Sequence, residues 1–170
     1  RLTEGLGQEW VLKTIGIKRH ACLIMLHSTI DAMVEERAGG LRATQVDRIR
    51  IGVSESVAKR TAWKMQHPGT PLSAQMNLRF ATAVALLDGA AYVEQFDSSS
   101  LARPEVWELM ERIDVDHDPA IDELGRDRRF VTDVEIRLVD GSRRSLRTTP
   151  PQDREFDDEA VRVKFRGLVS

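Results

Sequence analysis

The sequence contains only one cysteine, Cys22, among its 170 residues. A single cysteine excludes an intramolecular disulfide framework and fits a reducing compartment. Long apolar runs are missing too, because none reaches the roughly 18–20 residues that a helix needs to cross a bilayer. No signal-peptide pattern occurs near the start, so we expect a cytoplasmic protein without a membrane partner. The chain begins at Arg1 rather than at a methionine, which leaves open an upstream targeting segment.

Aromatic residues are scarce as well, and neither sign of charge is in large excess. Aromatic side chains make up 5% of the residues, and the net charge is −2 with basic and acidic residues interleaved. Nucleic-acid-binding domains usually present a basic face, and RNA-binding sheets add stacking aromatics, so the composition argues against a nucleic-acid partner. A hydrophobic fraction of 41% is typical of a soluble globular protein. We expect a single domain with a sizeable core over residues 1–170.

Hydrophobic periodicity and turn residues predict the secondary structure of the first half. Residues 10–18 mix apolar and β-branched side chains and indicate a strand. Ser28 is expected to cap a helix, with Asp31 three positions later, and this helix should end at Gly39-Gly40. The helix would bury Ile30, Met33 and Val34. A strand is predicted over 46–53, with Ile49, Ile51 and Val53 on one face and Arg48 and Arg50 on the other. A short helix is expected within 54–66.

The second half is predicted to contain a β-hairpin and three helices. Residues 131–139 alternate between apolar and polar, and Asp140-Gly141 supplies a turn into a strand over 142–148. Residues 74–87 are almost entirely small or apolar and end at Asp88-Gly89, which indicates one helix buried on most sides. The other expected elements are a loop over 67–71, a helix over 104–111 opened by Pro104, a strand over 112–116, a loop over 118–129 and a terminal helix over 157–168.

The order of these elements mixes helices with strands and ends in an antiparallel hairpin. A doubly wound parallel sheet would need a regular alternation of strands and helices. We therefore predict an α+β fold, a two-layer α/β sandwich with a mainly antiparallel sheet.

The densest chemistry lies between the first predicted strand and the first predicted helix, where Lys18, His20, Cys22 and His27 occur together. A helix that starts at Ser28 would place His27 at its positive end, which disfavours an imidazolium and leaves a neutral ring able to accept a proton. A basic Lys18 could pair with a carboxylate of a ligand. Such a set suits proton abstraction next to a carboxylate. The alternative is that the histidine simply caps the helix.

Other motifs point to structure rather than to chemistry. Cys22 lies among apolar residues and is expected to be a small core residue rather than a nucleophile. Asp116-His117-Asp118 could suggest a metal, but no second ligand cluster occurs at a recognisable spacing, so a solvated loop is expected. Gly5-Leu6-Gly7 lacks the third glycine of a phosphate-binding loop. We therefore expect no metal and no organic cofactor.

Several motifs, in order along the chain, resemble the MmgE/PrpD family. Lys18–Cys22 and His27–Ala32 look like the family segment Lys-x-Tyr-Pro-x-Cys followed by His-x-x-Ile-Asp-Ala. The block over 74–89 resembles the family's buried helix, which ends in Asp-Gly. Further matches in the expected order are Thr70-Pro71-Leu72, Pro104-Glu105-Val106, Val139-Asp140-Gly141, Asp158-Glu159 and Val163-Lys164-Phe165.

The resemblance implies a two-domain enzyme, of which this chain is the C-terminal α+β domain and a large helical N-terminal domain is absent. Family members include 2-methylcitrate dehydratase, cis-aconitate decarboxylase and iminodisuccinate epimerase, which act on small di- or tricarboxylates by proton transfer at carbon, generally without metal or organic cofactor. The resemblance also implies a homodimer and an active site between the two domains. We expect the full-length protein to be a lyase or isomerase, 2-methylcitrate dehydratase-like, and the isolated domain to be inactive. The terminal helix over 157–168 would pack on the missing domain.

The resemblance also assigns site residues. Lys18 and His27 match positions that line the family's site, and we take them as catalytic, while His20, Ser28, Asn77 and Phe80 would bind the substrate. His20 stands where the family usually has Tyr, with Ala21 in place of Pro, and Phe80 lacks the hydroxyl of the usual Tyr, with Arg79 in place of Pro. These departures leave open whether the reaction is dehydration, decarboxylation or epimerisation. A non-catalytic module for small-molecule binding or dimerisation is the alternative function.

Overall fold

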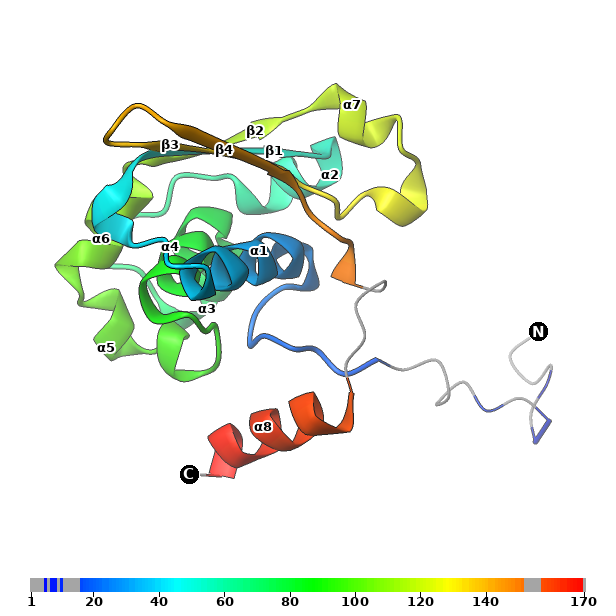
Figure 1. The fold of residues 1–170 in the computed structure, drawn as a ribbon. Coiled ribbons are helices and arrows are strands. Elements are labelled where there is room, and N and C mark those ends of the chain that lie inside the picture. Colours follow the sequence, from blue (N-terminus) through cyan, green and yellow to red (C-terminus); the bar gives the residue numbers. More distant parts are fainter. Residues whose placement is uncertain (1–4, 6, 9, 11–15, 152–156, 170) are drawn as a thin grey trace.

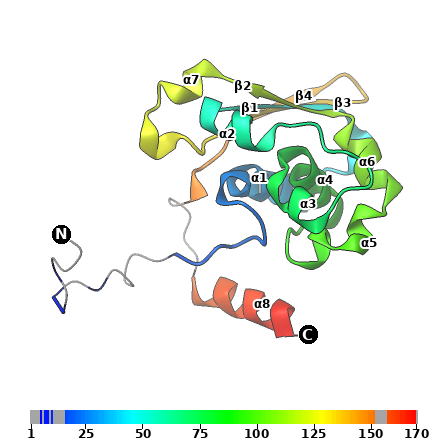
Figure 2. The ribbon, with the colours of Figure 1, turned by 180° about the vertical axis from the view of Figure 1, so that it is seen from behind.

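A computed structural model describes residues 5, 7, 8, 10, 16–151 and 157–169 (Figure 1). A four-stranded sheet forms one layer, and α1, α3, α4 and α6 form a second layer on one face of it, as both views show (Figures 1 and 2). The α+β fold predicted from the sequence is confirmed. The bounds of the helices are His27–Ala38 (α1), Glu55–Thr61 (α2), Pro71–Met76 (α3), Leu78–Asp88 (α4), Ser98–Leu101 (α5), Pro104–Met110 (α6), Pro119–Asp122 (α7) and Asp158–Val169 (α8).

The strands are β1 (Val46–Val53), β2 (Ile113–His117), β3 (Asp133–Leu138) and β4 (Arg143–Arg147), and their order in the sheet is β2-β1-β3-β4. β1 pairs with β2 in parallel and with β3 antiparallel, and β3 pairs with β4 antiparallel. Two of the three pairings are therefore antiparallel, in agreement with the predicted sheet. The parallel pairing needs a long crossover, which the helices between β1 and β2 supply.

The alternation predicted for β1 is observed. Ile49 and Ile51 are fully buried against the helices, whereas Arg48 and Arg50 lie on the other, exposed face. Apart from α7 at one end, no helix of the described residues covers that face (Figure 1). The hairpin turn at Asp140-Gly141 is also observed: Gly141 has a φ of +85°, and the Asp140 carboxylate accepts a hydrogen bond from the Ser142 amide at 2.9 Å.

The single helix predicted over 74–87 is wrong, because the chain breaks at Asn77. This residue has an extended backbone (φ −106°, ψ 122°) and separates α3 from α4. Its Oδ1 accepts a hydrogen bond from the Phe80 amide at 3.1 Å, so Asn77 caps α4, as asparagine commonly does. The predicted end of the helix is correct, since Gly89 adopts a left-handed conformation with a φ of +75°.

Three other predictions change. Residues 11–15 of the strand expected over 10–18 lie outside the described residues, and Trp10 and residues 16–18 belong to no strand. Ser28 does not cap α1, because the 3-10 turn Ile24–Leu26 runs directly into the helix and places Leu26 at the cap position. The loop expected over 118–129 contains α7, whose first turn is capped by the Asp118 carboxylate. Further 3-10 turns among the described residues are Ala43–Gln45, Glu94–Phe96 and Arg126–Arg128.

The core lies between the sheet and the two longest helices of the helical layer. α4 buries eight of its eleven residues, which agrees with the expected helix buried on most sides, and α1 packs along it. The terminal helix α8 is present as predicted, on the side of the helical layer away from the sheet (Figures 1 and 2). Within the part of the chain that is described, no helix has both the length and the apolar character needed to cross a membrane.

Candidate functional site

The segment over 18–26 is held in place by three backbone-directed hydrogen bonds. The Ala21 amide donates to the Ala91 carbonyl at 3.0 Å, and the Leu23 amide donates to the Gln75 carbonyl at 3.0 Å. The Gln75 side chain returns a bond to the Ala21 carbonyl at 2.8 Å. This segment is therefore fixed between α3 and the loop that follows α4.

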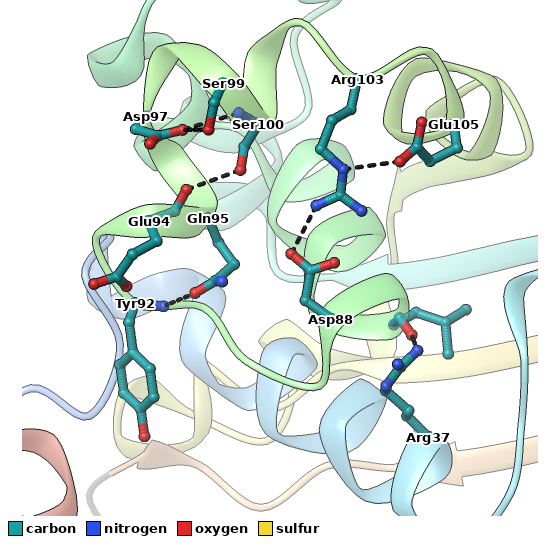
Figure 3. Close-up of polar contacts among 11 residues, drawn as sticks. Arg37, Asp88, Tyr92, Glu94, Gln95, Asp97, Ser99, Ser100, Arg103 and Glu105 are labelled. Carbon is teal, nitrogen blue, oxygen red and sulfur yellow. Dashed lines mark hydrogen bonds and ion pairs between the residues drawn. The ribbon is translucent and has the colours of Figure 1, made fainter. Parts of the chain in front are cut away.

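The loop after α4 is itself ordered by polar contacts, which Figure 3 shows. Arg103 bonds to Asp88 at 2.8 Å, at the end of α4, and Gln95 accepts from the Tyr92 amide at 2.9 Å. The Tyr92 ring lies with its centroid 6.5 Å from that of His20. The loop thus forms one side of the environment of His20.

His20 is held by Asp31, a contact that the sequence did not reveal. The Nε2 atom of His20 lies 2.8 Å from Oδ1 of Asp31, and both side chains are less than a tenth exposed. Nε of Arg19 lies 3.8 Å from the same carboxylate oxygen. Nδ1 of His20 is buried and has no hydrogen-bond partner among the described residues.

His27 lies behind His20 at the first position of α1. The two rings meet edge to face with centroids 5.0 Å apart. His27 hydrogen-bonds the backbone of Cys22, and its Nε2 is buried without a partner among the described residues, as is Oγ of Ser28. Burial, together with the charge of the neighbouring His20, lowers the pKa of His27 to about 4. The ring is therefore neutral at pH 7, as the sequence suggested, although burial and not the helix dipole is the main cause.

A pocket of about 430 Å³ opens beside His20. It brings together Lys18 and Lys164, which lie 146 positions apart in the sequence and meet because α8 passes the segment over 16–18. Nζ of Lys164 donates to the Lys18 carbonyl, and Nζ of Lys18 lies 3.5 Å from the Cys22 carbonyl. The complete lining is Lys18, His20, Ala21, Cys22, Leu23, Leu72, Gln75, Met76 and Lys164.

The charge of this pocket is one-sided. Its lining carries two lysines and one histidine, and among the described residues it contains no aspartate or glutamate. Two ammonium groups without a carboxylate between them favour an anionic ligand. Cys22 also lines the pocket, but burial raises the pKa of its thiol to about 12, so it is not a thiolate nucleophile.

The other residues predicted for the site lie elsewhere. Asn77 is fully buried, and besides capping α4 it donates from Nδ2 to the Trp63 carbonyl at 2.8 Å. Phe80 is fully buried in the core, with ring centroids 6.1 Å from Phe96 and 6.4 Å from Trp107. The structure therefore brings Lys18 and His20 to the pocket, places His27 and Ser28 behind it, and gives Asn77 and Phe80 structural contacts away from it.

A larger pocket of about 620 Å³ lies on the exposed face of the sheet, and its lining carries four acidic side chains and two arginines. Its lining includes Arg50 and Arg147, which bond to Asp116 at 3.2 Å and to Asp133 at 2.6 Å. His117 lies at one end and bonds to Asp122 at 2.6 Å. No group of three metal-ligating side chains occurs in the described part of the chain. The smaller pocket, with its unbalanced positive charge, is therefore the better candidate site.

The family model of the MmgE/PrpD C-terminal domain matches residues 20–170. A cis-aconitate decarboxylase-like protein of Aspergillus oryzae is 27% identical over 99% of this chain, and a cis-aconitate decarboxylase of Aspergillus terreus is 26% identical over 71% of it. The chain spans 36% of the first relative's length and 26% of the second's. The matched region includes the His20–Asp31 pair and the terminal helix with Lys164.

Proposed function

The chain belongs to the MmgE/PrpD family, and from this membership we propose that the full-length protein is a lyase acting on a small tricarboxylate of the cis-aconitate kind. The observation that carries the proposal is the pocket lined by Lys18, Lys164 and His20, to which the described part of the chain contributes no acidic side chain. The printed names of the relatives support cis-aconitate as the first substrate to test. 2-Methylcitrate, which the family resemblance suggested, is the second.

The reactions of both substrates transfer a proton to or from a carbon atom next to a carboxylate. Decarboxylation breaks a carbon–carbon bond, releases CO₂ and leaves an electron pair that takes up a proton. Dehydration removes a proton from carbon and releases the hydroxyl group as water. In either case Lys18 binds a substrate carboxylate, and a neutral imidazole at His27 assists proton transfer or orients the substrate. His20, in the pocket wall, contacts the substrate directly.

The proposed site is completed by partners outside this chain. We propose that a helical N-terminal domain closes the pocket, that α8 packs on this domain and that the protein forms a homodimer. The exposed apolar side chains of α8 support its packing, because Phe165, Leu168 and Val169 are each more than half exposed. The domain over 1–170 would then be inactive by itself.

A substrate screen of the full-length protein tests this function. We expect cis-aconitate to raise the melting temperature and to be converted with release of CO₂, while the isolated domain shows no turnover. Conversion of 2-methylcitrate with loss of water would support the lyase and change the substrate. Racemisation of an aspartate-derived acid without release of CO₂ or water would make the protein an isomerase. Binding without turnover of any of these acids would favour the non-catalytic module.

A further inference from the structure

One turn of α1 places two side chains against His20, which lies in the wall of the pocket. His27 and Asp31 are four residues apart, so their side chains lie on the same face of the helix. His27 meets the His20 ring edge to face, and Asp31 accepts a hydrogen bond from it at 2.8 Å. The helix therefore fixes the position of His20 from two directions.

The contact with Asp31 determines which ring nitrogen of His20 remains available. An ionised carboxylate can only accept a hydrogen bond, so Nε2 of His20 must carry the hydrogen that faces Oδ1 of Asp31. Nδ1 is then the one ring nitrogen that His20 can offer to a ligand. This atom has no partner among the described residues, although His20 itself lines the pocket.

The unpaired atoms argue for a role beyond packing. Buried polar groups in folded proteins are usually hydrogen-bonded, and leaving them unpaired costs free energy. Nδ1 of His20, Nε2 of His27 and Oγ of Ser28 are all buried without a partner among the described residues. A purely structural histidine held by an aspartate would not need two further unpaired groups beside it.

We propose that Asp31 is a positioning residue, which accepts the hydrogen bond from Nε2–H of His20, so that on substrate binding Nδ1 takes up a proton and donates a hydrogen bond to a carboxylate of the substrate. This inference rests on the proposed function for the identity of the ligand. Asp31 acts through His20 and does not touch the substrate. Nε of Arg19 lies 3.8 Å from the same Oδ1, so a positive charge lies on that side of the Asp31 carboxylate.

A double-mutant cycle on the full-length protein, assayed with cis-aconitate, tests this relation. Asp31→Asn keeps the side-chain volume and one acceptor oxygen, and His20→Gln removes the ring. We expect each single substitution to lower kcat/KM by roughly 10–100-fold, the range seen when a hydrogen-bonded partner that orients a histidine is lost. The double variant should lose about as much as His20→Gln alone, because the hydrogen bond to His20 is the contact through which Asp31 is proposed to act. Losses that multiply in the double variant, or an Asp31→Asn protein with unchanged kcat/KM, would overturn the proposal.

A spectroscopic measurement tests the positioning role of Asp31 independently of the proposed lyase activity. Proton–nitrogen correlation spectra of the imidazole groups should show the hydrogen of His20 on Nε2 in the unsubstituted protein and a mixture of tautomers in Asp31→Ala. Addition of cis-aconitate should shift the Nδ1 resonance. If this protein shows no turnover but gives both spectral results, the lyase fails and the positioning role stands. A hydrogen on Nδ1 instead of Nε2 would contradict the positioning role whatever the activity.

Discussion

The rings of His20 and His27 meet edge to face, with their centroids 5.0 Å apart, at the entrance to α1. Both are almost fully buried, and both have one ring nitrogen without a partner among the described residues. Two imidazoles in contact cannot both be charged at low cost, because like charges at this distance repel in a poorly solvated site. The pair therefore has a defined protonation pattern, in which His27 is the neutral member.

The first prediction concerns the dependence of stability on pH. The pKa of His27 is lowered from 6.5 to about 4 by burial and by the charges of His20 and Lys18, with Asp31 opposing them. Between these two values the unfolded chain binds a proton that the folded chain does not, so stability is lost as the pH falls from 6.5 to 4. The full contribution is roughly 3 kcal/mol. Denaturant unfolding at pH 7 and pH 4.5 should show a larger loss for the unsubstituted domain than for His27→Gln, and equal losses would contradict the lowered pKa.

The second prediction concerns the two lysines of the pocket. If Lys18 and Lys164 bind carboxylates, Lys18→Met and Lys164→Met should each raise KM for a tricarboxylate at least about tenfold, the equivalent of a lost charge-assisted hydrogen bond. The matched control is Lys59→Met, because Lys59 is exposed and pairs with Glu55 on α2. Initial-rate measurements on the full-length protein check this. A KM that changes as little in the pocket variants as in the control would remove the lysines from the site.

The third prediction separates a core role of Phe80 from a substrate-binding role. Phe80 is fully buried beside Phe96 and Trp107, so Phe80→Tyr would bury a hydroxyl without a partner in the described core. We expect a loss of stability of about 1–3 kcal/mol in urea unfolding and no gain in turnover. A Phe80→Tyr protein that is as stable and turns over faster would instead support contact with the substrate.

The fourth prediction concerns the break between α3 and α4. Asn77 caps α4 through Oδ1 and satisfies the Trp63 carbonyl through Nδ2. Asn77→Ala should lower the free energy of unfolding by about 1–3 kcal/mol, since it removes both the cap of α4 and the hydrogen bond to the Trp63 carbonyl. Asn77→Ser keeps a capping oxygen without burying a charge and loses the bond to Trp63, so its loss should be smaller. If both variants are as stable as the unsubstituted domain, the Asn77 cap does not stabilise the interruption between α3 and α4.

Local patterns predicted much of the fold. The bounds of β1, the Asp140-Gly141 turn and the left-handed glycine that ends α4 all depend on neighbouring residues, and all agree with the structure. The break at Asn77 was missed because the apolar run around it looks like one helix. Only the capping preference of asparagine, a residue unusual within such a run, could have revealed it.

The candidate site was less accessible to sequence reasoning. Lys18 and His20 were found because they lie in one short segment, and both line the pocket. Asp31 was read as part of a helix cap, whereas its carboxylate bonds to His20 eleven residues earlier. Lys164 lies on the last helix, and its approach to Lys18 depends on the path of the whole chain. Contacts of that kind follow from tertiary structure and leave no local signal, although the four-residue spacing of His27 and Asp31 was a usable hint.

The most direct measurement is the rate of CO₂ release from cis-aconitate by the full-length protein carrying His27→Asn, an amide that can still donate to the Cys22 backbone. The matched control is His117→Asn, at the far end of β2, and circular dichroism should show both variants folded. We expect His27→Asn to lose at least about 100-fold in kcat, within the range for a residue that transfers a proton, while the control keeps its activity. A folded His27→Asn protein that turns over cis-aconitate as fast as the control would contradict the catalytic role proposed for His27 behind this pocket.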